Sequence, residues 1–345
     1  MTVIDHVPGA TELDEEVIVA GAPTASHQSS TTPCPDVRGL GDDETYLALV
    51  DRLNRQSVDK HYDPFVDIAW DDPDLAIDAT DPRWARSAEV MFGRTAWFRS
   101  LDPAEQSRLG LFRIASAMKL GLEFENIPKR GLLEYAFKLP NGTPEFRYLY
   151  HETIEEAHHG LMFQEFVNRT GLPVEGLAWW EKVSSRRVVA LARWFPSLFF
   201  LFVLGGEDPI DHQQRQVLRE GGAHPLVERI MRIHVTEEAR HLSFARHHLK
   251  HEVPKLKGRQ RLRLSIAAPI LLGQMARQML LPPRQLVREF QIPKATVREL
   301  SRSPEAKAEV SESLHKVRRL CVELGLVNRF TVRLWKANDI WADPT

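Results

Sequence analysis

The sequence predicts an all-α protein, and three observations support that prediction. Apolar residues recur every three or four positions through most of the chain after residue 41. Alternating runs rich in Val, Ile and Thr, which are typical of strands, do not occur. Residues that start and stop helices bracket the periodic segments, as at Asp102-Pro103 and Gly171. We therefore expect long helices that pack on one another.

The expected helices follow in chain order. The first opens at an Asp42 N-cap, in DDETYLALVDRLNRQSV. The second starts at Asp102-Pro103 and kinks at Pro128, because proline lacks the N–H that a helix interior needs. The third runs from the turn LPNGTP (139–144) to Gly171. Further helices are expected at about 175–208, 210–221, 224–250, 258–280, 283–291 and 304–327.

The two ends of the chain differ in composition. Residues 1–40 are rich in Pro, Ser, Thr and acidic residues and have no apolar period. Such a segment cannot bury enough apolar surface to fold by itself. We therefore expect a flexible N-terminal extension over 1–40 and a single helical domain over 41–345.

Charge and cysteine content exclude some classes of function. Lys and Arg number 45 against 47 Asp and Glu, a net charge of −2 with the 14 His counted as neutral. A nucleic-acid binder normally carries a basic excess, so no nucleic-acid partner is expected. Two cysteines, Cys34 and Cys321, cannot build a disulfide framework. With no targeting segment at the N-terminus, we expect a cytoplasmic protein.

No membrane span is expected either. The most apolar stretch, Val188–Gly206, is interrupted by Arg193 and Pro196. A span needs about 20 residues with few or no charges, so this stretch is interpreted as a buried helix.

One helical segment carries a pattern of metal ligands. His234, Glu238 and His241 follow one another at spacings of four and three residues. At about 100° per residue they project within about 60° of one another, on a face that also carries aliphatic residues. A carboxylate and two imidazoles on a buried apolar face are costly unless something compensates them. A bound metal ion would do so.

A second segment, IEEAHHGLMF (154–163), offers two Glu-x-x-His pairs. Glu156 and His159 share the apolar face of the helix, whereas Glu155 and His158 point toward its polar side. We therefore take Glu156/His159 as the inward pair and Glu155/His158 as a solvated or rim pair.

Helical bundles that hold two metal ions combine two Glu-x-x-His helices with two helices that each give one Glu. Glu123 precedes Glu156 by 33 residues, and Glu207 precedes Glu238 by 31. Glu125 is the alternative to Glu123, about 200° away around the same helix. Pro209 is expected to disturb the helix of Glu207. The predicted fold is a ferritin-like four-helix bundle with additional N- and C-terminal helices.

These residues also resemble a known family. The set resembles the AurF-type non-haem diiron N-oxygenases, the p-aminobenzoate N-oxygenase family, over about residues 85 to 330. The extra histidine, His234, is the most diagnostic feature of that resemblance. The metal ligands that carry it are Glu123, Glu156, His159, Glu207, His234, Glu238 and His241.

The resemblance implies roles for these ligands. Glu156 and Glu238 would bridge two iron ions (Fe²⁺/Fe³⁺), Glu123 and Glu207 would be terminal, and the histidines would complete the two sites. Manganese is the alternative metal. The implied reaction is oxygenation of a small organic substrate by O₂, most directly an arylamine nitrogen. No catalytic residue beyond the metal centre is assigned, and an external reductase or ferredoxin would supply electrons.

Two other functions stay open at this point. A diiron C–H hydroxylase or desaturase would use the same metal core, and a ferritin-like storage protein would need no organic substrate. Phe163, Phe200 and Val203 could line a substrate pocket but are more often plain core. Arg318 and Arg319 are candidates to bind a substrate carboxylate. Trp179-Trp180 and Phe199-Phe200 are expected in the core or in the interface of a homodimer.

Overall fold

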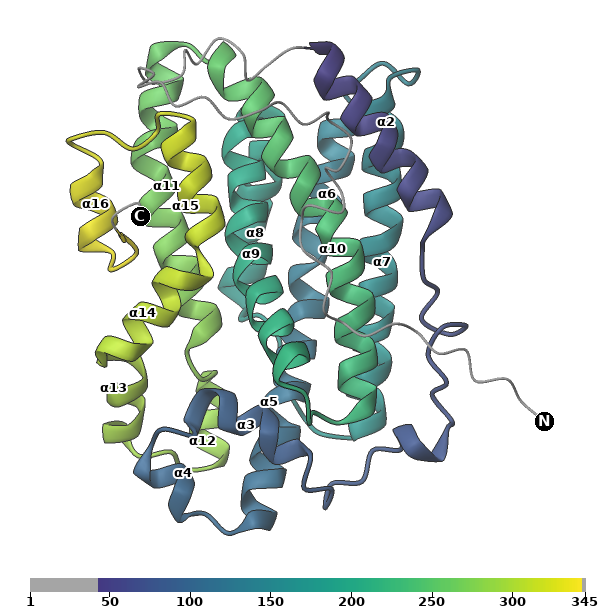
Figure 1. Ribbon diagram of the computed structural model, residues 1–345, viewed down its shortest axis with the longest axis vertical. Coiled ribbons are helices and arrows are strands. Elements are labelled where there is room, and N and C mark those ends of the chain that lie inside the picture. The colour runs from purple at the N-terminus through teal and green to yellow at the C-terminus, as the bar shows by residue number, and fades with distance from the viewer. Residues whose placement is uncertain (1–42, 343–345) are drawn as a thin grey trace, which may run out of the picture. The chain divides into compact units, whose positions relative to one another are not determined.

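The computed structural model describes residues 43–342, and every regular element within them is helical (Figure 1). The all-α prediction is confirmed. The longer helices are α2 (Asp43–Asp59), α5 (Pro103–Phe124), α6 (Asn126–Ala136), α7 (Pro144–Thr170), α8 (Trp179–Trp194), α9 (Pro196–Glu220), α10 (Pro225–Glu252) and α11 (Gly258–Leu280). The shorter elements are η2 (Pro73–Leu75), α3 (Trp84–Phe92), α4 (Ala96–Ser100), η3 (Val253–Lys255), α12 (Arg284–Glu289), α13 (Lys294–Arg302), α14 (Pro304–Ser313), α15 (His315–Glu323) and α16 (Val332–Ala337). Asp42, Cys34 and the expected flexible extension over 1–40 lie outside the described residues.

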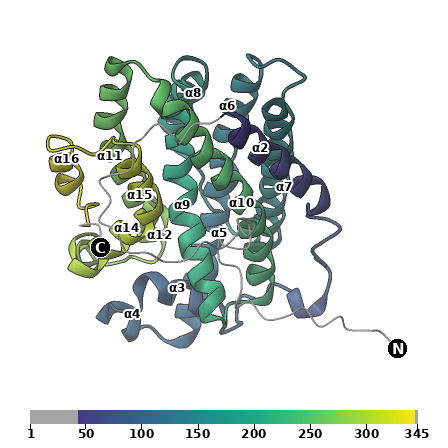
Figure 2. The same cartoon turned by 45° about the horizontal axis from the view of Figure 1, so that its top comes forward.

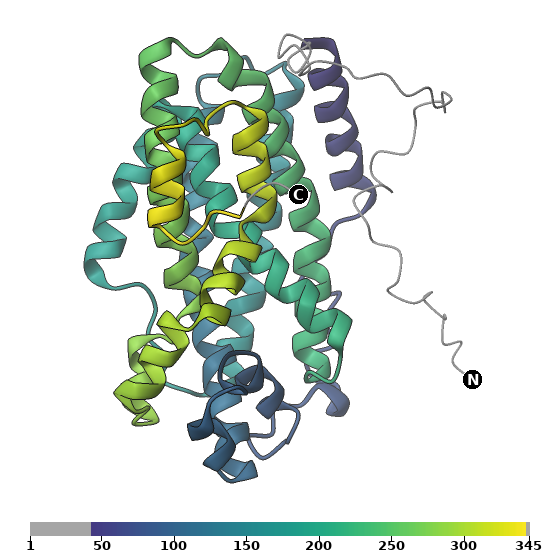
Figure 3. The same ribbon diagram turned by 60° about the vertical axis from the view of Figure 1, so that its left-hand side comes forward.

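Four long helices form the centre of the described domain. Helix α10 packs against α9 and contacts α7, while α7 packs against α5 (Figures 1 and 2). Helix α2 lies on α7 and α10, and α6 and α8 pack on each other. The C-terminal helices, yellow in Figure 3, lie on α9 and α11. The predicted four-helix bundle with additional helices at both ends is therefore confirmed.

Helix ends follow the signals in the sequence. Asp102 accepts a hydrogen bond from the Glu105 N–H, and the Glu105 carboxylate accepts one from the Asp102 N–H, so the two residues cap α5 reciprocally. At the start of α7, the Thr143 hydroxyl accepts a hydrogen bond from the Phe146 N–H and so caps the helix. Gly171 ends α7 with φ of 62°, a left-handed conformation that glycine adopts without strain.

Helix boundaries differ from those expected at four places. Pro128 lies in the first turn of α6, and the break precedes it, at Glu125. The long helix expected over 175–208 divides at Phe195, because Pro196 suits the first position of α9. Pro209 lies inside α9 without ending it, since α9 is held between α10 and α11 along its length. The helix expected over 304–327 divides at Leu314.

A polar layer crosses the bundle between two apolar clusters. On one side of it, residues such as Leu149, Val203 and Leu242 belong to one cluster. On the other side, residues such as Phe163 and Ile230 belong to another. The buried charged residues between them come from α7, α9, α10 and the α5–α6 junction. Apolar packing on both sides keeps water away from this layer.

One described stretch, Gly258–Glu289, is long and apolar enough to cross a membrane by length and composition. Of its most apolar window, 47% is buried within the fold. Core helices of globular proteins pass the same test, so this is weak support for a span. The stretch Val188–Gly206 is instead split between α8 and α9, and its Phe199–Leu204 part is buried.

Candidate metal centre

Helices α7 and α10 place two glutamates and two histidines around one point. The Nδ1 atom of His241 lies 3.0 Å from Glu238 Oε1 and 3.2 Å from Glu156 Oε1. The Nδ1 atom of His159 lies 3.5 Å from Glu156 Oε2 and 3.5 Å from Glu238 Oε1. All four side chains are buried. Each carboxylate thus faces both imidazoles, which is the arrangement expected of groups shared between two metal ions.

His234 and Glu207 extend this group. Their ligand atoms and one of Glu238 lie within 4.8 Å of one another. Glu207 reaches the cluster because α9 stays helical through Pro209, so the expected disturbance does not displace it. Phe124 and Gly206 pack closely here, since a Cβ at Gly206 would lie 2.3 Å from the Phe124 ring. That contact brings the α5–α6 junction against α9 beside Glu207.

Glu123, which we predicted as a ligand, does not reach the cluster. Its carboxylate lies 3.3 Å from Lys119 Nζ and 3.0 Å from Lys182 Nζ, and it accepts a hydrogen bond from the Leu177 N–H. These contacts fasten the segment before α8. The structure brings together the other six predicted residues.

Glu125 occupies the place expected for Glu123. It is 2% exposed, its Oε1 lies 3.5 Å from His234 Nε2, and it groups with His159 and His234. The sequence does contain a signal for it, because Leu111 and Met118 precede it at seven-residue intervals on the buried face of α5. The prediction of Glu123 rests instead on its spacing of 33 residues from Glu156.

Orphaned polar atoms show that the cluster fits a metal. One oxygen of each glutamate in the cluster is buried without a hydrogen-bond partner, as are Nδ1 of His159 and of His234. Buried polar atoms are rarely left unpaired, and four carboxylates in an apolar layer need compensating positive charge. Two divalent ions would match a charge of −4. The glutamates concerned are Glu125, Glu156, Glu207 and Glu238.

Two further carboxylates, which we call the supporting carboxylates, accept hydrogen bonds from two of the three histidines. Glu155 of α7 accepts a hydrogen bond from His241 Nε2 at 2.8 Å, and Glu237 of α10 accepts one from His159 Nε2 at 2.9 Å. Each helix therefore orients the other helix's histidine. A carboxylate on one ring nitrogen fixes the tautomer and leaves the other nitrogen free for a metal. Glu155, expected at the rim, is in fact 3% exposed.

Arg240 joins the supporting carboxylates. Its Nη2 lies 2.8 Å from Glu155 Oε1 and 3.7 Å from Glu237 Oε1, and the residue is 4% exposed. The backbone of Tyr62 covers the same side, because its N–H donates to Glu237 and its carbonyl accepts from His158. This cover from the segment after α2 explains why the outer side of α7 is buried. Neither Glu237 nor Arg240 was identified from the sequence.

Protonation in the metal-free cluster reflects this crowding. Burial and neighbouring carboxylates raise the pKa of Glu125 and of Glu207 well above the usual range. Burial opposes ionisation of Glu155 too, but His241 and Arg240 outweigh it and lower its pKa to about 2. Burial likewise opposes the charge on His159, yet Glu156 and Glu237 raise its pKa to about 9. Protons thus supply part of the positive charge that metal ions would supply.

His234 differs from the other two histidines because neither supporting carboxylate bonds to its ring. Its Nδ1 atom has no hydrogen-bond partner, and the Phe163 ring lies beside it at 5.4 Å between centroids. Burial and the neighbouring His159 lower its pKa well below the usual value. It is therefore a neutral imidazole, the form that a metal ligand needs.

The remaining candidates lie outside the cluster. Phe200 and Val203 belong to the apolar core. Arg318 is engaged by the carbonyls of Ser311 and Ile340, and Arg319 is exposed. Trp179 and Trp180 are 73% and 52% exposed, so of the two expected places, core or dimer interface, only the interface stays open for them, whereas Phe199-Phe200 is buried.

The fold and the cluster together define a ferritin-like helical protein with a buried carboxylate–histidine site consistent with two metal ions. The family described as p-aminobenzoate N-oxygenase AurF matches the chain over residues 43–325. The chain belongs to this family, as the resemblance in the sequence indicated.

Curated relatives extend over most of the chain. The uncharacterized protein Rv0885 of Mycobacterium tuberculosis (strain H37Rv) is 39% identical over 308 residues, which cover 89% of this chain and 91% of the relative. The uncharacterized protein Mb0909 of Mycobacterium bovis matches with the same identity and coverage. No solved structure matches the chain significantly.

Proposed function

We propose that this protein is a diiron oxygenase that uses O₂ to oxygenate a small organic substrate, most directly an amine nitrogen. The observation that carries the proposal is the buried set of four glutamates and three histidines, whose charge of −4 matches two ferrous ions. Mixed carboxylate and imidazole ligands suit iron, and manganese is the alternative. Zinc sites normally use four ligands, fewer than this set offers.

Each residue of the metal cluster would have a defined task. Glu156 and Glu238 face both His159 and His241 and would hold the two ions together. Glu125 and Glu207 would be terminal ligands. Iron bound there would supply the electrons for the reduction of O₂. The apolar clusters on either side of the layer would exclude water, and the supporting carboxylates would keep the histidines in the ligating tautomer.

Membership of the family supports an amine as substrate, because its description names p-aminobenzoate N-oxygenase. A diiron hydroxylase or desaturase acting on a C–H bond is the second candidate, since the metal core would be the same. A storage protein is the third. It would require a solvent-open centre, whereas the ligands here are buried between two apolar clusters.

Metal analysis and oxygen reactivity test the proposal. The protein is loaded with Fe(II) anaerobically, O₂ is added, and the visible spectrum is followed with and without p-aminobenzoate and other amines. We expect about two iron ions per chain and a faster spectral change with a substrate amine. Products are then analysed for N–O against C–O bond formation. One zinc ion and no iron would refute the diiron assignment, and indifference to all amines would refute N-oxygenation.

His234 gives a second test. His234→Ala should lower metal occupancy or change the spectrum of the iron-loaded protein, because one ligand is lost. His247→Ala is the matched control, since His247 lies on the same helix and its Nδ1 contacts only the Ser243 carbonyl. Equal metal content and spectra in the two variants would exclude His234 as a ligand.

Three further proposals accompany this function. An external reductase or ferredoxin would deliver electrons to the centre. The exposed Trp179 and Trp180 of α8 would contribute to the interface of a homodimer, because large exposed aromatic side chains are enriched at interfaces. The protein would be located in the cytoplasm, where the thiol of Cys321 would stay reduced.

A further inference from the structure

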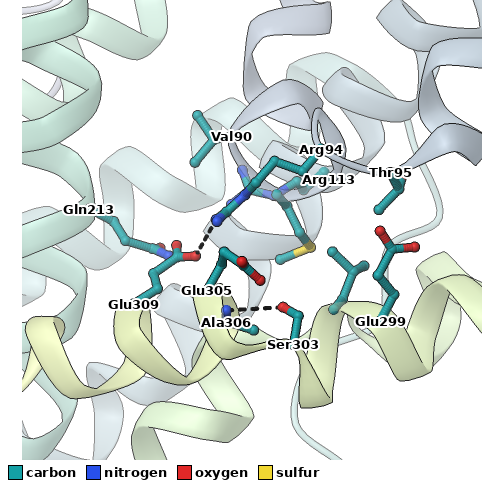
Figure 4. A pocket seen from close by; sticks show the side chains of 12 residues that line it. Val90, Arg94, Thr95, Arg113, Gln213, Glu299, Ser303, Glu305, Ala306 and Glu309 are labelled. Carbon is teal, nitrogen blue, oxygen red and sulfur yellow. Dashed lines mark hydrogen bonds and ion pairs between the residues drawn. The ribbon is translucent and has the colours of Figure 1, made fainter.

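A cavity of about 310 Å³ lies where α5 and α9 meet the segment around α3 and the C-terminal helices α13 and α14 (Figure 4). Val90, Met91 and Leu300 give it an apolar lining, and Arg94 and Arg113 contribute positive charge. Arg113 precedes Glu125 by twelve residues, about 18 Å along the helix axis. The cavity is therefore separate from the metal centre.

Arg113 is the unusual residue of this cavity. Its Nε atom is buried without a hydrogen-bond partner, and no carboxylate among the described residues lies within ion-pair distance of it. Burial lowers the pKa of the guanidinium to about 10, although Glu309 opposes this at longer range. Arg113 is only partly exposed, and no protein group offsets the desolvation of its buried Nε atom. Its position is explained if a ligand supplies the partner.

The other charges of the cavity are already satisfied or solvated. Arg94 is largely exposed and pairs with Glu309 at 3.2 Å, a surface contact that contributes little to stability. Glu299 and Glu305 lie at the exposed rim, where water and salt weaken their repulsion of an anion. Among the guanidinium groups of the cavity, Arg113 is thus the one that is partly buried and has no carboxylate partner among the described residues.

We propose that this cavity binds a small organic carboxylate, which accepts hydrogen bonds from Arg113 while its apolar body lies against Val90, Met91 and Leu300. Guanidinium groups bind carboxylates through two parallel hydrogen bonds, which gives both strength and orientation. The inference does not depend on the proposed function, since none of these residues belongs to the metal cluster.

The test compares three probes of similar shape by calorimetry and ligand-observed NMR on the full-length, iron-loaded protein. Hexanoate should bind, and neutral hexanamide and cationic hexylammonium should bind at least about tenfold more weakly. Arg113→Met should lose hexanoate binding by a similar factor, and Arg113→Lys should lose less. Arg108→Met, an exposed change on the same helix, is the control for net charge and should bind like the wild type.

Stability separates a ligand-binding role from a structural one. If Arg113 is kept for a ligand, Arg113→Met should melt no lower than Arg108→Met, because the substitution removes no ion pair with a described carboxylate. Hexanoate binding that is undetectable in the wild type or unchanged in Arg113→Met would overturn the proposal. So would equal binding of hexylammonium, or a melting temperature of Arg113→Met well below that of the control.

Discussion

The two halves of the metal centre are built differently. On α7 and α10 the segments 155–159 and 237–241 share the pattern Glu-Glu-Ala-x-His. Each gives one ligand glutamate, one ligand histidine and a supporting carboxylate for the opposite helix. On α5 and α9 the ligands are single glutamates at irregular places. Glu125 follows the last residue of α5, and Glu207 lies two residues before a proline.

The difference concerns what holds each ligand in place. His159 and His241 have supporting carboxylates at 2.9 and 2.8 Å, and Arg240 joins those carboxylates. All four ligand glutamates have an orphaned oxygen, but burial and neighbouring carboxylates raise the pKa of Glu125 and of Glu207 well above the usual range. One half is therefore fixed by the protein before a metal binds, whereas the other half depends on the metal for its charge balance.

The largest expected effect distinguishes Glu125 from Glu123. Glu125→Gln removes a buried carboxylate from the cluster and should weaken binding of one metal ion by more than about 100-fold, beyond the effect usual for residues behind a ligand. Glu123→Gln, two residues away, removes only contacts to Lys119, Lys182 and Leu177. It should leave two ions bound. Metal analysis after gel filtration, together with Fe(II) titration, measures both.

The opposite result would be informative. If Glu123→Gln lost metal and Glu125→Gln kept it, the α5–α6 junction would have to rearrange when metal binds. The free energy of unfolding of Glu123→Gln provides the control, since loss of a partly exposed ion pair should change it by less than about 1 kcal/mol.

The sequence predicts the regular half of this site well and the irregular half poorly. On α7 and α10 a constant 3.6-residue period relates every residue to its face, so Glu156, His159, His234, Glu238 and His241 could be placed together. At the α5–α6 junction the period of α5 points to Glu125, seven residues after Met118, but the spacing to Glu156 favoured Glu123, and no local rule states where the chain breaks before Pro128. Tertiary packing decides the break.

The supporting residues illustrate a different limit. Glu155 was assigned to a polar side because its helix neighbours are polar, but the Tyr62 segment covers that side. Tyr62 lies 96 residues before His158 in the chain, so helix periodicity contains no information about this contact. The fold class needed only local patterns, whereas the environment of Glu155 and Arg240 required the long-range arrangement.

A second, smaller effect tests the arginine between the supporting carboxylates. Arg240→Met leaves Glu155 and Glu237 without their shared cation, so the orientation of His159 and His241 should loosen. We expect metal affinity to fall about 10- to 100-fold, with an altered spectrum of the bound iron. Arg240→Lys keeps the charge but not the planar fork and should recover part of the affinity.

A structural role alone would give a different result for Arg240. Melting temperature would then fall in both variants, while the affinity and spectrum of the folded fraction would match the wild type. Arg246→Met is the comparison. Arg246 lies on α10, as Arg240 does, and pairs with Asp208 of α9, which is not one of the cluster residues.

The smallest expected effect is on pH dependence. In the metal-free protein burial raises the pKa of Glu152 from 4.5 to about 8, and the carboxylates Glu156 and Glu237, outweighing burial, raise that of His159 from 6.5 to about 9. The folded state therefore binds more protons than the unfolded state across this range. Buried histidines with a lowered pKa, such as His234 and His248, oppose this effect below about pH 7, so stability of the metal-free protein should fall as pH rises from about 7 to about 9. Urea unfolding at several pH values measures this slope.

Metal should reverse that dependence. Ligands must lose protons before they bind an ion, so binding should release protons and metal affinity should increase with pH over the same range. Glu152→Gln fixes the neutral form of a buried group that is outside the ligand set and should reduce the slope of the metal-free protein. A metal-free protein whose stability increased between about pH 7 and about pH 9 would show that the cluster holds no excess protons. Glu125 and Glu207 would then be ionised without metal, and the half of the centre on α5 and α9 would not depend on metal ions for its charge balance.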